Sequence, residues 1–418
     1  MEFSWKYGKD KMDFAVPDNN VLSVLKRQIP NTNIEASEMI KQALAKPIGT
    51  SSLADIIKSK QPKSVVIVVN DITRPTPYKQ MLPPILHELE QAGVPAQAVT
   101  MLVATGIHRS HTDAENANMY GSEVCQKYRV INHDCDQDVI SMGILSNGAE
   151  MFVNRMAADA DLLITTGLIG LHYIAGYSGG RKSILPGIAG RPSIEFSHAM
   201  MADERACLGN VKNNPVDIML KEAALKVGVD FIMNVVTDDD KNIIGVVAGD
   251  VIEAWEAGVE MCRQASVCQI YEQSDIVIAG CGGYPKDINV YQSQKALDAA
   301  APAVKDGGVI ILVAHCEEGL GEDVFERWVE EASSIQDIKD RFDRKFELGG
   351  HKAYAIGRLC ERVEVVLVSG MDPELVRKTF MNPFSTVEDA LVYAINKMGA
   401  DAKIYIMPQA PSLAVEVL

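Results

Sequence analysis

Aromatic residues, positive charge and long apolar runs are all scarce in this sequence. Phe, Trp and Tyr make up 6% of 418 residues, and 40 Lys and Arg stand against 56 Asp and Glu, which gives a formal net charge of −16. Such a chain is a poor partner for nucleic acid or an anionic membrane surface, because both need a basic face. No stretch approaches the roughly 18 apolar residues of a membrane-spanning helix, and the first residues hold no apolar signal core.

The eight cysteines form no CxxC pair and show no zinc-ligand spacing. Scattered thiols in a long chain are typical of a reducing compartment and not of a disulfide framework, so we expect a cytoplasmic protein. A composition of 47% apolar and 23% charged residues excludes disorder.

The length favours two or three domains, and short β-branched runs alternate with amphipathic helices. This pattern predicts α/β domains with mostly parallel sheets. The expected strands are Ser64–Val69, Ala98–Ala104, Asp161–Thr165, Phe231–Val236, Asp275–Ala279, Val309–Val313, Val363–Val368 and Ile404–Met407. The expected helices are Pro83–Ala92, Asp217–Val227, Val251–Gln264, Tyr291–Ala299, Val324–Ile335, Pro373–Lys378 and Val387–Lys397. A boundary near Cys268–Ser274 would divide the chain into residues 1–270 and 271–418, and the acidic run at 238–242 is typical of a solvated turn.

Three consecutive strands of the first domain end in unusual loops, NDITRPTP at 70–77, TGIHR at 105–109 and TGLIGLH at 166–172. Ligands of parallel α/β sheets bind at the carboxyl ends of strands, where these loops would bring Arg74, His108 and His172. Each feature alone has a simpler explanation: an Asx turn at Asp71, a surface charge at Arg74, a capping histidine. Three such loops on one sheet edge favour a site.

The densest motif is HYIAGYSGGRKSILPG at 172–187. Its glycines could free backbone amides to cradle a phosphate, with Arg181 or Lys182 adding charge. It is not a phosphate loop of the GxxxxGK[ST] type, because Arg181 replaces the second glycine and Pro186 breaks the helix that should follow. A mobile surface loop is the alternative, but the apolar stretch at 184–189 favours a buried loop, in which Lys182 would be a neutral, nucleophilic amine.

His198 offers an imidazole for Zn, Ni, Cu or Fe, but no HExxH motif or thiolate pair accompanies it, and nothing completes a set around His108 and His111. In the second domain, glycines at 280–283 precede a helix on which Tyr291, Gln292 and Lys295 share one face. A cation beside an amide donor suits a carboxylate, although a solvated helix face explains the same spacing.

Taken together, these segments resemble the nickel-dependent lactate racemase family, whose members racemise or epimerise 2-hydroxy acids. The resemblance covers nearly the whole chain and is carried by DITRPTP at 71–77, TGIHR at 105–109, HYIAGYSGGRKSILPGIAG at 172–190, His198, and GYPKDINVYQSQKA at 283–296. It implies a nickel-pincer nucleotide, a pyridinium-3,5-bisthiocarboxylic acid mononucleotide whose two sulfur-bearing arms hold one nickel ion.

The resemblance also implies roles for particular residues. Lys182 would link the cofactor covalently, and His198 would complete the nickel coordination beside the cofactor's own donors. His108 and His172 would be the paired acid/bases. Asp71, Ile72, Thr73 and Arg74 would contact the nucleotide, and Gln292, Lys295 and Tyr291 would bind the substrate from the second domain, across a cleft that holds the active site.

The implied reaction removes the α-hydrogen of a 2-hydroxy acid as hydride while one histidine takes the hydroxyl proton, which leaves a planar 2-keto acid. Return of the hydride to the opposite face, with a proton to the oxygen, inverts the centre. The resemblance implies lactate or a related 2-hydroxy acid as the substrate. His351 and Lys352 stand where the family's lactate racemases carry an aromatic residue. They fit either a larger or more polar substrate or a surface loop, so lactate stays a candidate. The alternative is a non-catalytic homologue that binds nucleotide and organic acid. Expected partners are the small-molecule substrate, the cofactor-synthesis proteins and a second copy in a homodimer.

Overall fold

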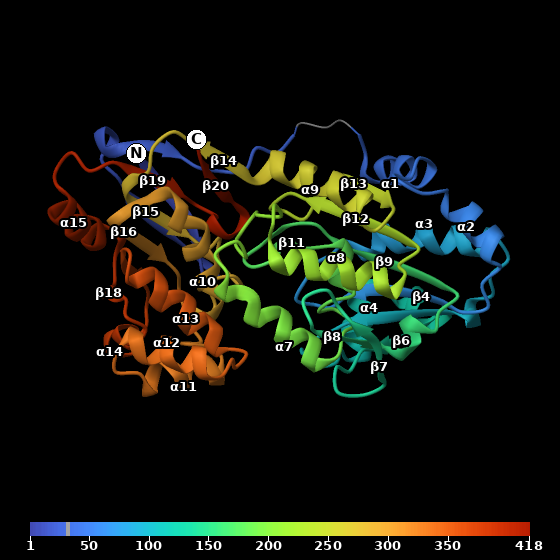
Figure 1. Cartoon of the computed structure of the whole chain (residues 1–418). Coiled ribbons are helices and arrows are strands. Elements are labelled where there is room, and N and C mark those ends of the chain that lie inside the picture. The colour runs from blue at the N-terminus through green and yellow to red at the C-terminus, as the bar shows by residue number, and fades with distance from the viewer. Residues whose placement is uncertain (31–33) are drawn as a thin grey trace. The chain divides into compact units, whose positions relative to one another are not determined.

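The computed structural model describes residues 1–30 and 34–418, and the chain divides into two units (Figure 1). The central unit is residues 29–265, and the terminal unit combines residues 1–28 with residues 266–418. This differs from the expected division, which assigned residues 1–270 to one domain. The reason is that β3 (Val21–Val24) pairs in parallel with β19 (Ile404–Met407), so the first residues complete the terminal unit's sheet.

The central unit is built on a six-stranded sheet with the order β13-β12-β9-β4-β5-β6, parallel except between β12 and β13. The chain runs outward from β4 to β6 on one side and from β9 to β13 on the other. The topological switch point therefore lies between β4 and β9, where ligands of such sheets bind. The strands are β4 (Val65–Asn70), β5 (Val99–Ala104), β6 (Arg129–Asn132), β9 (Leu162–Leu168), β12 (Phe231–Thr237) and β13 (Ile243–Gly249).

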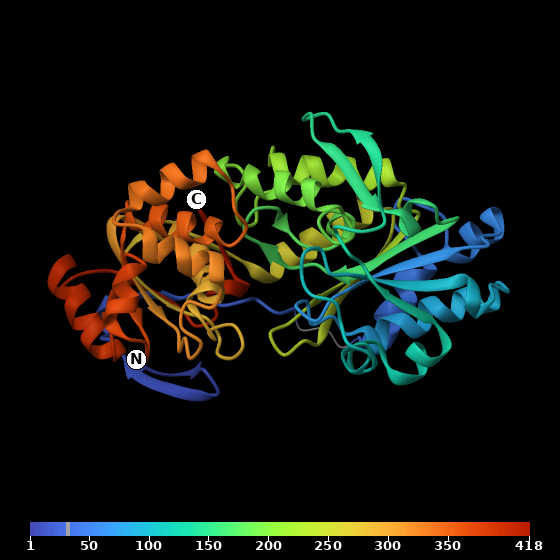
Figure 2. The same cartoon turned by 90° about the horizontal axis from the view of Figure 1, so that it is seen from below.

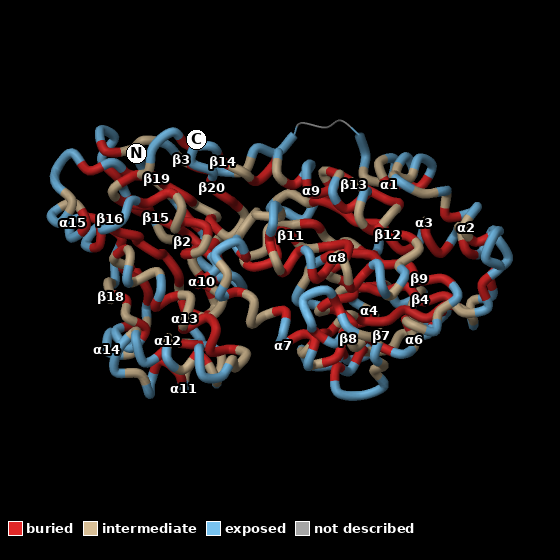
Figure 3. Tube along the Cα trace, in the orientation of Figure 1, coloured by how far each residue is buried: buried red, intermediate tan, exposed pale blue. Residues whose placement is uncertain are grey.

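The sheet is buried because its strands are apolar on both faces, as the run VVIVV in β4 shows. Figure 3 shows these strands buried and the outer sides of the helices exposed. The helices are α1 (Ala36–Ala45), α2 (Leu53–Lys60), α3 (Tyr78–Gln91), α4 (Asp113–Tyr120), α5 (Ser122–Lys127), α6 (Arg155–Ala158), α7 (Arg191–Ala199), α8 (Pro215–Val227) and α9 (Glu253–Ser266). Two antiparallel pairs are separate from the sheet, β7 (Val139–Ile144) with β8 (Glu150–Asn154) and β10 (Leu171–His172) with β11 (Gly176–Tyr177).

The terminal unit has an all-parallel sheet with the order β18-β17-β16-β15-β19-β3, whose switch point lies between β15 and β19. The N-terminal hairpin of β1 (Glu2–Tyr7) and β2 (Asp10–Ala15), dark blue in Figure 2, adds Trp5 and Phe14 to its core. The remaining strands are β14 (Val267–Ile270), β15 (Ser274–Gly280), β16 (Val304–Val313), β17 (Glu364–Val368), β18 (Asn382–Phe384) and β20 (Ala414–Val417). The helices are α10 (Val290–Ala300), α11 (Asp323–Glu331), α12 (Ile335–Arg344), α13 (Gly350–Cys360), α14 (Pro373–Lys378) and α15 (Val387–Met398).

All eight expected strands are present, and two expected helices have limits that differ by more than two residues. Helix α3 begins at Tyr78 and contains Pro83 and Pro84, because Tyr78 is fully buried and anchors the first turn. Helix α11 ends at Glu331, since Ser334 caps a new helix, α12. No helix in the described part of the chain is long and apolar enough to cross a membrane.

Candidate active site

The loops predicted to carry function follow β4, β5 and β9, on both sides of the central switch point. The backbone joins them, since Gly106 N–H donates to Gly187 O at 2.9 Å. The stretch after Lys182 is a buried loop as expected, with Ile184, Leu185 and Ile188 fully enclosed.

Asp71 and His108 form a close pair in this region. Asp71 Oδ2 lies 2.6 Å from His108 Nδ1, and Asp71 is only 4% exposed. Burial raises the pKa of Asp71, but the contacts with His108 and Thr73 outweigh it and hold the pKa below its usual value. Asp71 is therefore a carboxylate, so His108 Nδ1 carries a proton and Nε2 is the nitrogen left to accept one.

His111 is part of the scaffold of this loop. Its Nε2 accepts the N–H of Ile72 at 2.8 Å, and its Nδ1 donates to Asn116 Oδ1 at 3.0 Å. Both ring nitrogens are thus engaged, and His111 has none left for a metal ion. Tyr120 Oη holds the other end of the loop by donating to Asn70 O at 2.7 Å.

His172 ends β10 and has the opposite hydrogen-bond polarity from His108. Its Nδ1 accepts the backbone N–H of Ile174 at 3.4 Å and of Ala175 at 3.2 Å. Burial, followed by the charges of Lys182 and Arg74, places the pKa of His172 well below its ordinary value. At neutral pH the ring is neutral, and because Nδ1 is the acceptor, its proton lies on Nε2.

Lys182 lies on the short 3₁₀ turn at Gly180–Ser183, whose first N–H donates to Asn234 Oδ1 at 3.2 Å. Burial, with the neighbouring charges of Arg74 and Arg181, moves the pKa of Lys182 far below its ordinary value. Burial therefore favours the neutral, nucleophilic form of this amine. Arg74 also lowers the pKa of His172, which shows that the three side chains lie in one region.

His198, near the end of α7, has one ring nitrogen engaged and one open. Its Nδ1 donates to Ile194 O at 2.8 Å, which leaves the Nε2 lone pair available. Burial and then the charge of Lys182 lower the pKa of His198 to about 4, so the ring is neutral at pH 7. A neutral imidazole held by its other nitrogen is the usual form of a metal-ligating histidine.

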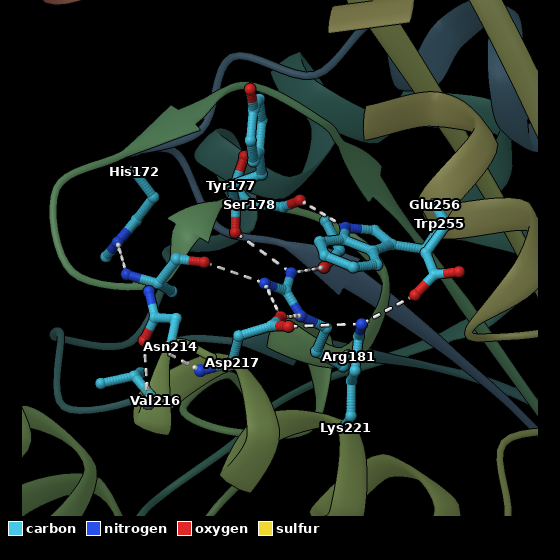
Figure 4. A network of polar contacts seen from close by, with 12 residues as sticks. His172, Tyr177, Ser178, Arg181, Asn214, Val216, Asp217, Lys221, Trp255 and Glu256 are labelled. Atoms are coloured by element: carbon cyan, nitrogen blue, oxygen red, sulfur yellow. Dashed lines mark hydrogen bonds and ion pairs between the residues drawn. The ribbon is translucent and has the colours of Figure 1, made fainter. Parts of the chain in front are cut away.

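Arg181 does not provide charge for a phosphate, contrary to one expectation from the sequence. It is fully buried, and its guanidinium bonds Asp217 Oδ1 at 2.7 Å through Nε and Ala175 O at 3.0 Å and Tyr177 O at 3.1 Å through the terminal nitrogens (Figure 4). It also stacks on Trp255, with 3.5 Å from its central carbon to the ring centroid. Arg181 is therefore a clamp on the loop.

The glycines of this loop are explained by packing and not by a phosphate cradle. A Cβ on Gly176 would lie 2.2 Å from Asn210 O, and one on Gly180 would lie 2.7 Å from Trp255 Cδ1. Both also have positive φ, at 73° and 51°, which favours glycine. The N–H of Gly180 already donates to Asn234 Oδ1, so it is not an open donor for a phosphate.

Tyr291, Gln292 and Lys295 belong to the terminal unit, on α10 just after the loop that follows β15. Lys295 Nζ donates to Gln292 Oε1 at 2.6 Å, which joins an ammonium and an amide on one helix face. The Tyr291 ring packs edge-on against Phe325, with 6.0 Å between centroids.

His351 and Lys352 do not form a surface loop. They lie on α13 and are only 2% and 3% exposed. Lys352 Nζ donates to Tyr291 O at 2.7 Å and lies 4.5 Å from the centroid of the Tyr291 ring. Their contact with the predicted substrate residues therefore runs through Tyr291.

Sequence reasoning missed Asn214, Asp217 and Trp255, whose hydrogen bonds to residues 174, 181 and 178 fix the loop that carries His172 and Lys182. The only signal at Asn214 is Asn before Pro215, which marks a helix start and nothing more. Contacts of this kind join residues far apart in the chain, so no spacing reveals them.

The comparisons with known proteins cover nearly the whole chain. Residues 7–209 match the model of the lactate racemase N-terminal domain, and residues 270–415 match that of the lactate racemase C-terminal domain. A lactate racemase of Thermoanaerobacterium thermosaccharolyticum is 35% identical over 420 residues, and one of Lactiplantibacillus plantarum is 32% identical over 424, each alignment covering 98% of both chains. The structure of the lactate racemase apoprotein from the former organism superposes with a TM-score of 0.93 at 33% identity, over 100% of both chains. A Thermotoga maritima protein at 18% identity, with a TM-score of 0.68 over 94% of this chain and 100% of its own, shares the fold.

Proposed function

The chain belongs to the lactate racemase family, and from that premise we propose that it interconverts the enantiomers of a 2-hydroxy acid, with lactate as the first candidate. As a racemase it is an isomerase. The observation that carries the proposal is the gathering of His108 with Asp71, His172, Lys182 and His198 around one switch point.

The donor set fits the nickel-pincer nucleotide. The lowered pKa of Lys182 favours the neutral amine that a covalent link requires, and His198 presents an open Nε2 to a metal that prefers nitrogen and sulfur donors. The turn from Asp71 to Arg74 would contact the nucleotide. When bound, this cofactor supplies an acceptor for the α-hydrogen, which is too weakly acidic for an unaided side chain to remove as a proton.

The protein's own part is to move the hydroxyl proton. His108 Nε2 is arranged to accept it, and the imidazolium that forms would be stabilised by the Asp71 carboxylate at 2.6 Å. His172 Nε2 carries the proton, because Nδ1 accepts from the backbone, and would donate a hydrogen bond to the same substrate oxygen. Loss of hydride and proton together leaves a planar 2-keto acid, and return to its opposite face inverts the centre.

Gln292 and Lys295 would bind the substrate carboxylate. The Gln292 carbonyl accepts from Lys295, so the amide nitrogen of Gln292 would serve as a donor near the ammonium. A cation and an N–H donor together match a carboxylate. Because Lys352 is bound to Tyr291 O and His351 Nδ1 accepts the N–H of Gly349, these two buried side chains do not argue for a larger acid, and lactate stays the first choice.

We also propose a cytoplasmic location, which the free state of all eight cysteines supports. The proposed partners are the proteins that make the cofactor and a second copy in a homodimer. Size-exclusion chromatography with light scattering checks the oligomeric state.

The test uses enantiopure D- and L-lactate, and other 2-hydroxy acids, with protein produced beside its cofactor-synthesis partners. Wild type should racemise at least one acid, and its intact mass should show a covalent adduct. His108→Ala and His172→Ala should each lose racemisation by about 10²–10⁴-fold while adduct and nickel stay near wild type. Single-turnover formation of 2-keto acid should fall in both variants, since one lacks the proton acceptor and the other lacks the hydrogen-bond donor to the same oxygen. If protein that carries the adduct and nickel racemises none of the acids, the alternative of a non-catalytic binding homologue would be favoured.

A further inference from the structure

The peptide between Ile174 and Ala175 is held at both of its polar ends. Asn214 Nδ2 donates to Ile174 O at 2.8 Å, and the Ala175 N–H of the same peptide donates to His172 Nδ1 at 3.2 Å. A peptide is planar and trans, so its C=O and N–H point in opposite directions. Fixing the carbonyl therefore fixes the direction of the N–H that reaches His172.

Asn214 can take only one orientation. It is fully buried at the start of α8, where its Oδ1 accepts the N–H of Val216 at 2.9 Å. Its Nδ2 meets a second carbonyl, Asn210 O, at 2.9 Å. Turning the amide over would place its oxygen against two carbonyl oxygens and its nitrogen against a backbone N–H.

The next peptide is held by the same helix end. Arg181 donates to Ala175 O at 3.0 Å and is itself bound by Asp217, three residues after Asn214 on α8. Figure 4 shows Asn214, Asp217 and Arg181 gathered around the turn that begins at His172. The first turn of α8 thus fixes two consecutive peptides next to the His172 ring.

We propose that Asn214 is a positioning residue for His172: by aiming the Ala175 N–H at Nδ1, it holds the histidine proton on Nε2. This makes His172 a hydrogen-bond donor and His108 an acceptor. For His172 itself to take a proton at Nε2, its own proton must first move to Nδ1, and the N–H groups of Ile174 and Ala175 must both turn away. The part that His172 plays in catalysis rests on the proposed function, whereas the position of its proton does not.

The test replaces Asn214 by Ser, which keeps an N-cap oxygen of equal quality but removes the Nδ2 donor. The matched control is Asn20→Ser in the terminal unit, because Asn20 Nδ2 also donates to two carbonyls, Ala400 O at 2.8 Å and Ala402 O at 2.9 Å. Long-range ¹H–¹⁵N correlation spectra of ¹⁵N-histidine-labelled, cofactor-free protein report which ring nitrogen is protonated. The spectrum of His172→Gln identifies the resonances of His172.

We expect a protonated Nε2 and a bare Nδ1 in wild type and in Asn20→Ser. In Asn214→Ser the two nitrogen shifts should move toward each other as both tautomers become populated. Loaded Asn214→Ser should lose about 10- to 100-fold in kcat with KM within about threefold, since a small displacement of a reacting group costs this much. Unchanged shifts, or the same change in Asn20→Ser, would overturn the inference.

Urea unfolding of each protein checks that the variants fold. A second variant keeps the test decisive if Asn214→Ser does not fold. Asn214→Asp keeps the cap and places an acceptor where the donor was, so it should change the His172 spectrum at least as much as Ser does. The spectra also separate the two proposals. A responsive spectrum in a protein that racemises no acid would leave the positioning role intact and remove the proposed function, whereas an unresponsive spectrum in an active racemase would do the reverse.

Discussion

Replacing Asp71 by Asn should slow turnover strongly without removing the cofactor. The variant keeps the size of the side chain but loses the carboxylate that lies 2.6 Å from His108 Nδ1. A hydrogen bond to a charged partner contributes about 1.5–3 kcal/mol, and 1.36 kcal/mol corresponds to tenfold. If the imidazolium of His108 forms in the transition state, kcat should fall by about 10- to 150-fold.

The assay is racemisation of the best 2-hydroxy acid, with adduct and nickel measured on the same samples. Asp136→Asn is the control, because it removes a carboxylate from an exposed ion pair with Arg191 and should change kcat by less than about twofold. A kcat within twofold of wild type for Asp71→Asn, with full cofactor content, would refute the pairing with His108. Loss of the adduct would instead point to the nucleotide contact that the sequence suggested for Asp71.

The same substitution has a pH signature in stability. The pKa of Asp71 is lower in the folded protein than its ordinary value of about 3.9. Its contribution to the free energy of unfolding is therefore complete above about pH 4–5 and is lost as the pH falls through the folded pKa. Wild type should lose more stability than Asp71→Asn over that acid range, as urea titrations at each pH would show.

Three further substitutions test the rest of the arrangement. Lys182→Ala should yield protein without the covalent adduct in intact-mass spectra, even beside the cofactor-synthesis partners, and a retained adduct would remove Lys182 from its role. His198→Ala should keep the adduct and lose most of its nickel by elemental analysis, so unchanged nickel would exclude it as the ligand. Asp217→Asn leaves Arg181 as a buried, unpaired cation and should lower the free energy of unfolding by about 3–5 kcal/mol in urea, whereas a loss below about 1 kcal/mol would contradict the clamp.

The sequence predicts the buried strands well because each one is a short run of consecutive apolar residues. Val65–Val69 is apolar at every position, and a short β-branched run of this kind between two helices favours a buried strand. It does not predict β3, whose residues Val21–Val24 become a strand only through pairing with β19, nearly four hundred residues later in the chain. Helix α3 extends past two prolines for a similar reason, since Tyr78 is held by Asn70 and Thr166 across the sheet.

The candidate site shows the same limit. Strand-end motifs point to His108 and His172, the glycine-rich motif points to Lys182, and His198 is singled out as a lone imidazole. The structure places all four in the central unit. The motif around Arg181 misleads, because a basic residue among glycines looks the same whether it faces a ligand or a buried acid. Only its contact with Asp217, 36 residues away, decides between them.

The pairing of β3 with β19 also bears on how the protein is made. Residues 1–28 leave the ribosome before the central unit, but β19, the partner strand of β3, is synthesised only after that whole unit. The central unit has all its strands in one continuous stretch and can fold while the chain is still growing. Until β19 emerges, β3 has no strand to pair with, so this is the interval in which the nascent chain most needs protection from aggregation.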